Sequence, residues 1–471
     1  MNTYIHSVSL DASKCTGCTT CMKHCPTEAI RVRRGCAVID AERCIDCGEC
    51  IRNCPNNAKK SICNSFDEIK NYKYKIALPA PSLLAQFDNL DNIGYVLKGL
   101  LDIGFDEVFE VAKGAEIVSE HTRLYLQTEG IRKPVISTAC PVVTRLILIR
   151  FPFLKDNLIP LLPPVEVAAH MAVEEAMKKN PELKREDICT CFISPCPAKV
   201  SYVRNGFGSY KSEVDLVVSM SEIYFQLINV MKRENAADIP SQAGRIGLSW
   251  AICGGEGSAL LNDKIIAADG INNVISVLDQ IEDGNIPPVD FVELNACPSG
   301  CVGGVLTIEN PYVAKNRLHT LRRYMPVSLV PHSEEDAYIP ENSFFGDLPE
   351  YRPLNRLSDS IGESMRLMSK IQALRKELPG IDCGSCGAPN CRAFAEDIVM
   401  GNADRNECII AYKDFIKKYI EDGDDGNILY EIDHGRIRPS KMLQDSLTQM
   451  LKGNKEFYMI DTQKIVYEYA L

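Results

Sequence analysis

Short apolar runs alternate with amphipathic stretches through the middle of the chain, starting near Lys75. Five runs are rich in β-branched or aromatic residues and read KIALPAPS, VISTAC, ICTCFISPC, VDLVVS and DFVELNAC. Between them lie segments with helical periodicity, such as Val165 to Lys179. This alternation predicts an α/β fold with largely parallel strands.

The same pattern contains no apolar run of the roughly 18 to 20 residues that a membrane-spanning helix needs. The best candidates are interrupted by Arg145 and Arg150, and the start MNTYIHSVSLD lacks a signal-peptide pattern. With 52 basic and 63 acidic residues the net charge is −11, and no long basic cluster occurs. We therefore expect a cytoplasmic protein that binds neither nucleic acid nor membrane. Its 471 residues exceed the length at which a single hydrophobic core stops growing, which predicts two or more domains.

Cysteine spacing changes this picture, because 21 cysteines in a reducing cytosol favour metal or cluster binding over disulfides. The first 54 residues repeat the spacing CxxCxxCxxxCP, as CTGCTTCMKHCP and CIDCGECIRNCP. This is the bacterial ferredoxin arrangement, in which the fourth cysteine of each copy ligates the other cluster. It predicts a two-cluster domain over 1–65, and zinc is the less favoured alternative. One 4Fe-4S cluster is assigned Cys15, Cys18, Cys21 and Cys54, and the other Cys44, Cys47, Cys50 and Cys25.

Four further cysteines stand at the ends of strand-like runs. Cys140 lies in STACP, Cys196 in ISPCPAK, and Cys297 and Cys301 in ELNACPSGCVGG. In an open α/β sheet the carboxyl ends of the strands form the ligand site, so these cysteines are expected to converge. The alternative is four buried structural thiols.

These segments resemble the active-site motifs of FeFe hydrogenases, and the resemblance covers roughly residues 75 to 330. It implies an α/β catalytic domain over 75–345 whose four cysteines hold the 4Fe-4S part of an H-cluster. Cys301 would bridge to a two-iron subsite with carbonyl, cyanide and an azadithiolate bridge. Lys199 matches the family lysine that donates to a cyanide ligand, and Pro81 and Ser82 match a segment lining that side. Gly300 and Gly303 would let the backbone approach the inorganic group.

Departures from the family pattern concern proton transfer and the surroundings of the cluster. Active relatives carry a proton-relaying cysteine where this chain has Ala139, which can neither donate nor accept a proton. Glu116 aligns with one member of the family's glutamate pair, whereas Lys113 stands at the other. Cys253 is a candidate substitute relay, although an inert buried thiol is the simpler interpretation. Three polar residues replace the expected side chains near the cysteines: Ser194, Tyr202 and Asn295.

A third cysteine group follows a helical run predicted from Ser360 to Glu377. Its spacing is CxxCx4Cx16C, with a helix expected from Arg392 to Met400. The group resembles the small 4Fe-4S domain of the corrinoid iron-sulfur protein and predicts one cluster in a domain over 355–425, with zinc as the alternative. A C-terminal extension over 426–471 has no catalytic pattern. The predicted ligands are Cys383, Cys386, Cys391 and Cys408.

The full set of motifs resembles the sensory FeFe hydrogenases that lack a PAS domain. That resemblance implies a slow enzyme of an anaerobe, which interconverts H2 and protons and passes electrons along a row with the H-cluster in its middle. A ferredoxin-like redox protein, a kinase or phosphatase, and a second copy of the chain are the expected partners. A ferredoxin-linked metabolic hydrogenase and a non-catalytic iron-sulfur scaffold remain alternatives.

Overall fold

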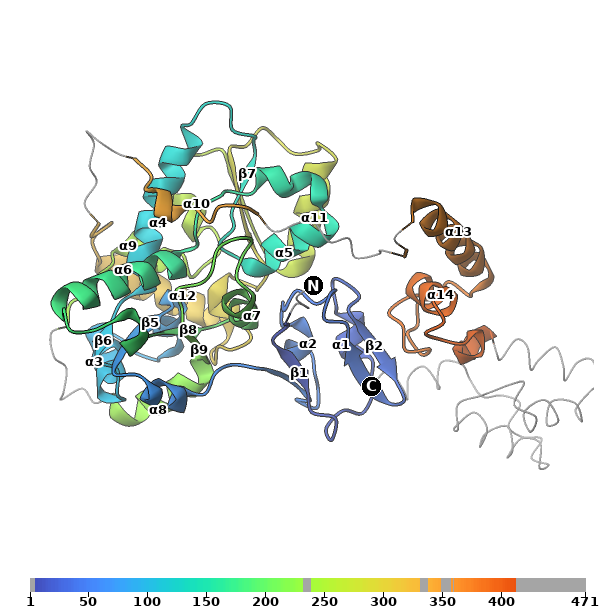
Figure 1. The fold of residues 1–471 in the computed structure, drawn as a ribbon, viewed down its shortest axis with the longest axis horizontal. Helices are drawn as coiled ribbons and strands as arrows, with labels where there is room; N and C mark the ends of the chain where they lie inside the picture. Colours follow the sequence, from blue (N-terminus) through green and yellow to red (C-terminus); the bar gives the residue numbers. More distant parts are fainter. Residues whose placement is uncertain (1–4, 232–238, 331–337, 349–356, 359, 412–471) are drawn as a thin grey trace, which may run out of the picture. The chain divides into compact units, whose positions relative to one another are not determined.

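The chain divides into two compact units, and Figure 1 follows it from the N-terminus to the C-terminus. The large unit comprises Met1–Ser9, Cys44–Arg52 and Lys60–Leu354. The small unit comprises Leu10–Arg43, Asn53–Lys59 and Asn355–Leu471. The segment 1–65, expected as one domain, thus contributes to both units. The computed structural model describes residues 5–231, 239–330, 338–348, 357–358 and 360–411.

A four-stranded parallel sheet forms one half of the large unit, in the order β6-β5-β8-β9. Strand β8 is buried along its whole length, as expected for a parallel strand covered by helices on both faces. Ile76 of β5 lies opposite Thr190 of β8. The strands are β5 (Tyr74–Pro79), β6 (Glu107–Val108), β8 (Ile188–Ser194) and β9 (Leu216–Ser219).

A second parallel sheet has three strands in the order β10-β11-β7. The predicted parallel α/β fold is confirmed, and its strands are divided between two sheets. Each sheet packs into its own apolar core, one around Leu78 and Ile193 and the other around Ile136 and Val292. The strands are β7 (Val135–Ile136), β10 (Ile265–Asp269) and β11 (Phe291–Asn295).

Helices surround both sheets of the large unit (Figure 1). The helix predicted over Val165 to Lys179 is confirmed as α6. The α-helices are α3 (Gly94–Asp102), α4 (Val111–Leu126), α5 (Pro141–Arg150), α6 (Pro164–Lys179), α7 (Pro197–Asn205), α8 (Met220–Val230), α9 (Arg245–Ser249), α10 (Gly255–Ala259), α11 (Ile271–Glu282) and α12 (Pro311–Leu321). The 3-10 helices are η1 (Phe66–Asn71), η2 (Pro81–Gln86), η3 (Pro152–Asn157), η4 (Arg185–Asp187), η6 (Cys301–Gly303), η7 (Arg322–Tyr324) and η8 (Glu341–Ser343).

The second ferredoxin-type motif is built into the large unit together with α2 (Glu49–Arg52). The carboxylate of Asp46 is buried there, and it accepts hydrogen bonds from the Ser7 amide at 2.8 Å and the Ser201 hydroxyl at 2.6 Å. The Arg145 guanidinium donates to the Cys44 carbonyl at 2.9 Å. These buried contacts fix the cysteine loop on the α/β core.

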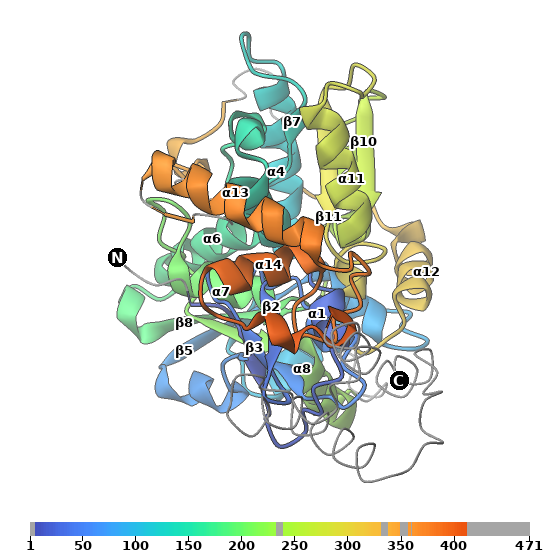
Figure 2. The same cartoon turned by 90° about the vertical axis from the view of Figure 1, so that its right-hand side faces the viewer.

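The small unit contains a β-hairpin and two packed helices. Strand β2 (Ile30–Arg33) pairs antiparallel with β3 (Cys36–Ile39), next to α1 (Thr20–Lys23). Helix α13 (Ile361–Glu377) lies along α14 (Cys391–Val399), followed by η9 (Arg405–Glu407), as Figure 2 shows. Both predicted C-terminal helices are confirmed, whereas the extension 426–471 lies outside the described residues. Two strands contain a boundary between the units: β1 (Val8–Leu10) contains the boundary after Ser9, and β4 (Lys59–Ser61) contains the boundary after Lys59.

Among the residues that the structure describes, no helix combines the length and apolar character needed to cross a membrane.

Candidate functional site

Each of the four central cysteines follows the carboxyl end of a parallel strand, as predicted. Cys140 follows β7 and precedes α5, while Cys196 follows β8 and precedes α7. Cys297 and Cys301 follow β11, and Cys301 begins η6. The expectation of a single sheet edge needs correction, because Cys196 comes from the four-stranded sheet and the other three from the three-stranded sheet.

The four central sulfurs lie near one another, since each affects the ionisation of its neighbours. Burial raises the pKa of Cys196 to about 12, and the nearby Cys140 adds to this shift. The pKa of Cys301 is likewise raised to about 12, mainly by burial and then by the neighbouring Cys140 and Cys196. Burial and then the other three sulfurs raise the pKa of Cys297. All four are free thiols, and such buried thiolates need a cationic group or metal to be stable.

Lys199 supplies a buried cation one turn after Cys196. Burial lowers the pKa of Lys199, while Glu166 and then the cysteine sulfurs oppose that shift. Its Nζ lies 5.1 Å from the centre of the Tyr202 ring. A positive charge placed among four thiols and beside an aromatic face favours a bound anion.

Two observations indicate space and polarity for a bound group. Cys301 is the exposed member of the four central cysteines, so its side chain is accessible to a bound group. The Ser82 hydroxyl is completely buried, and no residue that the structure describes forms a hydrogen bond with it. Ser82 and Pro81 lie on η2, which packs against η6. The sulfur donors, the ammonium and the unpaired hydroxyl fit an anionic iron-sulfur group with polar ligands.

The polar residues that depart from the family pattern differ in the hydrogen bonds that they form. The Ser194 hydroxyl donates to the Cys196 carbonyl at 3.0 Å and accepts from the Cys196 amide at 3.1 Å. The Asn295 amide donates to Glu293 at 2.8 Å. The Tyr202 hydroxyl is buried and unpaired among the described residues. Such groups set the local hydrogen bonding and dielectric around a cluster.

Sequence reasoning missed a hydrogen-bonded chain beside Ala139. The Ala139 amide donates to the Ser137 hydroxyl at 3.2 Å. That hydroxyl in turn donates to the Glu256 carboxylate at 2.8 Å. Burial raises the pKa of Glu256 far above its usual range, and the charge of Glu293 adds to the shift.

Glu293 is a second buried carboxyl and the neighbour of Glu256. Burial raises its pKa, although the amides of Gly257 and Gly254 donate to it at 2.8 Å and 2.9 Å. Burial and the charge of a neighbouring carboxyl both favour the protonated form of such a pair. A sequence signal for Glu293 existed, since it interrupts the apolar run DFVELNAC.

Cys253 lies against the loop that contains Cys297 and Cys301. Its amide donates to the Ser299 carbonyl at 3.1 Å. The pKa of the Cys253 thiol is raised to about 12, mainly by burial and then by the charge of Glu293. The thiol is therefore protonated at neutral pH, and its role as a relay stays a prediction.

Glu116 acts as a structural anchor in the described chain. Its carboxylate accepts hydrogen bonds from the Gly244 amide at 2.7 Å, the Ser328 hydroxyl at 2.8 Å and the Leu329 amide at 2.9 Å. Lys113 pairs with Glu175 at 2.9 Å. The structure thus gives both residues local partners, and proton transfer through Glu116 stays a prediction.

The glycines of the CPSGCVGG loop are required by backbone packing. A Cβ at Gly300 would lie 2.6 Å from the Cys253 amide nitrogen, and φ there is +91°. A Cβ at Gly303 would lie 2.0 Å from the Pro298 carbonyl oxygen. The packing of the loop therefore requires glycine at both positions, and their role in letting a bound group approach stays a prediction.

The second ferredoxin-type motif contacts the same core as the central cysteines. Cys47 packs against the apolar cluster that also contacts Cys140 and Cys196. The Arg52 guanidinium donates to the Gly303 carbonyl at 2.6 Å, two residues after Cys301. This arrangement brings a cysteine-rich loop next to the central site within the large unit.

The first ferredoxin-type group lines a cavity in the small unit. Burial raises the pKa of Cys21 to about 11, while Lys59 lowers it and the other three sulfurs raise it. The Lys59 ammonium is buried without a hydrogen-bond partner among the described residues. An anionic cluster on the sulfurs would pair with this ammonium. The lining cysteines are Cys15, Cys18, Cys21 and Cys54. Cys25 also lies in the small unit, where its sulfur accepts from the Ala29 amide at 3.3 Å.

The C-terminal cysteines line a separate cavity in the small unit. Burial raises the pKa of Cys386 to about 12, and the other three sulfurs add to this shift. The sequence-predicted group is therefore brought together around one space. Its members are Cys383, Cys386, Cys391 and Cys408.

The remaining cysteines lie away from these groups. Cys189 and Cys191 are buried inside β8, and burial raises the pKa of both thiols. Cys63 shares a 3.3 Å contact with the Ser61 hydroxyl. Cys36 begins β3. These surroundings are typical of structural thiols.

Comparison with known proteins identifies three domain families along the chain. Residues 73–247 and 251–305 match the iron only hydrogenase large subunit, C-terminal domain. Residues 7–62 match the 4Fe-4S dicluster domain, and residues 378–410 match an Fe-S cluster family. Iron-sulfur clusters are therefore bound by this chain.

Individual relatives are distant or match over short segments. One component of an ion-translocating oxidoreductase complex from Thiobacillus denitrificans is 42% identical over 59 residues, which is 12% of this chain and 30% of that protein. The match thus spans under a third of the relative's length.

Solved structures similar to this chain include an FeFe hydrogenase studied for oxygen damage to its H cluster. It has a TM-score of 0.43 and 15% identity, and the alignment covers 56% of this chain and 88% of that one. A variant of the FeFe hydrogenase from Chlamydomonas reinhardtii has a TM-score of 0.42 and 15% identity, with coverage of 55% and 86%. The chain therefore contains a C-terminal domain of the iron only hydrogenase large subunit, with one iron-sulfur domain before it and another after it.

Proposed function

We propose that this protein is a slow, sensory FeFe hydrogenase that couples the interconversion of H2 and protons to electron transfer. The supporting observation is Ala139, which stands beside an otherwise complete group of four cysteines and Lys199. A residue without a titratable group at this point slows proton exchange but leaves the cofactor site intact.

The central site would hold an H-cluster through Cys140, Cys196, Cys297 and Cys301. When bound, this cofactor supplies the two-iron centre at which H2 and protons interconvert. Lys199 would donate a hydrogen bond to an anionic ligand of the cofactor, and the unpaired Ser82 hydroxyl would donate to another. Both side chains then orient the cofactor.

Proton movement depends on groups near Ala139. The Ala139 amide donates to the Ser137 hydroxyl, and that hydroxyl donates to Glu256, whose pKa is raised by burial and by the charge of Glu293. The raised pKa favours the protonated form of Glu256, which would hold a proton near Ala139. The methyl side chain of Ala139 cannot donate a proton where active relatives have a thiol, so we expect slow delivery.

Electrons would leave through the cysteine loop packed on the central site. Cys44, Cys47 and Cys50 would bind one 4Fe-4S cluster, and Cys15, Cys18, Cys21 and Cys54 would bind a second one. The C-terminal group would hold a third. A ferredoxin-like protein and a kinase or phosphatase are the partners to which such a slow enzyme would report.

Infrared spectra of the protein loaded with the two-iron cofactor test this proposal. We expect carbonyl and cyanide bands that change when H2 is added, together with a low rate of H2 turnover. The matched control is Cys301→Ser, which should retain the other clusters but lose the bands because one of the four sulfurs that would hold the cofactor is gone. Absence of bands from the native protein, with all other clusters present, would contradict the proposal. Fast turnover with normal bands would contradict only its sensory part.

A further inference from the structure

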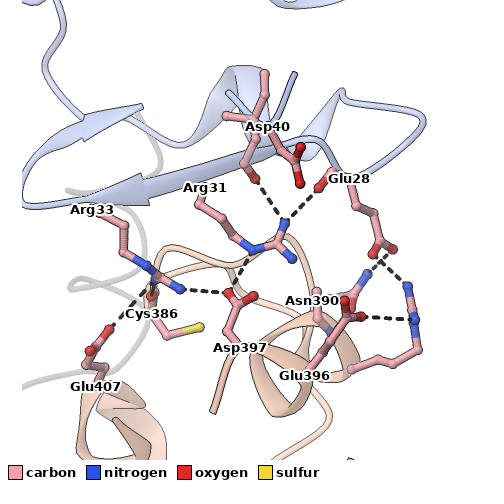
Figure 3. Close-up of polar contacts among 12 residues, drawn as sticks. Glu28, Arg31, Arg33, Asp40, Cys386, Asn390, Glu396, Asp397 and Glu407 are labelled. Atoms are coloured by element: carbon pink, nitrogen blue, oxygen red, sulfur yellow. Dashed lines mark hydrogen bonds and ion pairs between the residues drawn. The ribbon is translucent and has the colours of Figure 1, made fainter. Parts of the chain in front are cut away.

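Two arginines of β2 bind the C-terminal iron-sulfur module within the small unit. Arg31 Nε and Arg33 Nη2 each lie 2.7 Å from the same Oδ2 atom of Asp397, on α14 (Figure 3). Asp397 is only 7% exposed. A carboxylate with so little access to water depends on these two cations, because an unpaired buried charge is unstable.

A second set of polar contacts flanks this pair. Glu28 accepts hydrogen bonds from the Asn390 amide at 2.7 Å and from Arg392 at 2.6 Å. Arg43 pairs with Glu396, which is also buried. Charges of opposite sign thus alternate between the two segments, which fixes their register.

The backbones of the two segments also meet directly. The Val32 amide donates to the Gly387 carbonyl at 2.9 Å, and Arg33 Nη1 donates to the Cys386 carbonyl at 2.9 Å. A Cβ at Gly387 would lie 1.9 Å from the Val32 oxygen, and φ there is +76°. Only glycine permits this approach. We call the contacts of Glu28, Arg31, Val32, Arg33 and Arg43 with residues 386–397 the β2–α14 interface.

The β2–α14 interface lies between two cysteine-lined cavities. Val32 lines the cavity of Cys15, Cys18, Cys21 and Cys54. Cys386, whose carbonyl binds Arg33, lines the other cavity. One hydrogen bond and a few covalent bonds therefore connect the walls of the two cavities. A Cβ at Gly384 would also lie 3.1 Å from the Met22 methyl, next to Cys21.

We propose that the C-terminal module exchanges electrons directly with the cluster of Cys15, Cys18, Cys21 and Cys54, across the Val32–Gly387 contact. One 4Fe-4S cluster loses an electron and the other gains it, so no further reactant is needed. The inference rests on the cluster ligands named under the proposed function but not on hydrogen chemistry. It replaces the sequence-based order, in which the C-terminal cluster lay beyond the H-cluster.

Electron paramagnetic resonance of the full chain tests whether these two clusters are neighbours in the electron-transfer path. The protein carries its reconstituted iron-sulfur clusters but not the two-iron cofactor. In the reduced native protein we expect spin coupling between the C-terminal cluster and its neighbour. Asp397→Asn combined with Glu396→Gln should abolish the coupling while iron and sulfide content stay unchanged. The matched control is Glu363→Gln, which removes an exposed ion pair to Arg366 on α13 of the same module.

The coupling result and the presence of clusters are measured separately. Full iron content without coupling in the native protein would overturn the electron-transfer inference, and so would coupling that survives in the double variant. Missing iron at these sites would instead overturn the ligand assignment. If the double variant does not fold, hydrogen–deuterium exchange of the native protein decides. We expect slow exchange of the Val32 amide, and fast exchange would contradict the proposed hydrogen bond to Gly387.

Discussion

The hydroxyl of Ser137, which lies two residues before Ala139 in the chain, donates a hydrogen bond of 2.8 Å to Glu256. Both side chains are buried, and the Ala139 amide donates to the same Ser137 hydroxyl at 3.2 Å. Under the proposed function, Ala139 stands where a proton-donating thiol is needed, and its methyl group cannot donate.

Restoring that donor should increase activity. We expect Ala139→Cys to raise H2 turnover by at least about ten-fold, because a positioned proton donor contributes roughly 10²- to 10⁴-fold. Turnover is measured with the cofactor loaded and compared with Ala139→Ser, whose weakly acidic hydroxyl should give a smaller gain. Equal rates in all three proteins would show that proton delivery at this position does not limit the enzyme.

The buried carboxyl pair predicts how stability depends on pH. The pKa of Glu256 in the folded state is raised above 4.5, so the folded state retains a proton that the unfolded state loses. Stability from this group is full at acidic pH and falls as pH rises through the raised pKa. Glu256→Gln should flatten the decline of the melting temperature with pH. An unchanged slope would indicate that Glu256 is ionised in the folded protein.

Much of the site was predictable from local sequence, and the rest depended on tertiary contacts. Cys140, Cys196 and Cys297 follow apolar strands, so their convergence followed from the rule on strand ends. Glu256 lies between glycines in GGEGS and gives no periodic signal, because its burial arises from packing beside Ser137. The pairing of Arg31 with Asp397 joins segments far apart in sequence, and arginines and aspartates are too common on surfaces to reveal such a contact.

Lys199 should determine whether the two-iron cofactor is retained. We expect Lys199→Met to load the iron-sulfur clusters normally but to lose most of the carbonyl and cyanide bands, since no cation then faces the anionic ligands. Lys199→Arg is the control that keeps the charge with a different shape, and it should retain part of the bands. Full cofactor loading in the methionine variant would contradict the assigned role.

The glycine of the cysteine loop provides a test of its packing. Gly303→Ala places a methyl group 2.0 Å from the Pro298 oxygen, so the loop must shift. We expect a loss of about 1 to 3 kcal/mol in unfolding free energy, as for other overpacked sites. Gly362→Ala on α13 is the matched control, since its Cβ would lie 3.9 Å from the Ser360 hydroxyl. That helix should gain about 1 kcal/mol in place of a loss. Denaturant unfolding of the two variants should therefore show shifts of opposite sign, and a neutral Gly303→Ala would mean that the loop holding Cys301 is free to move.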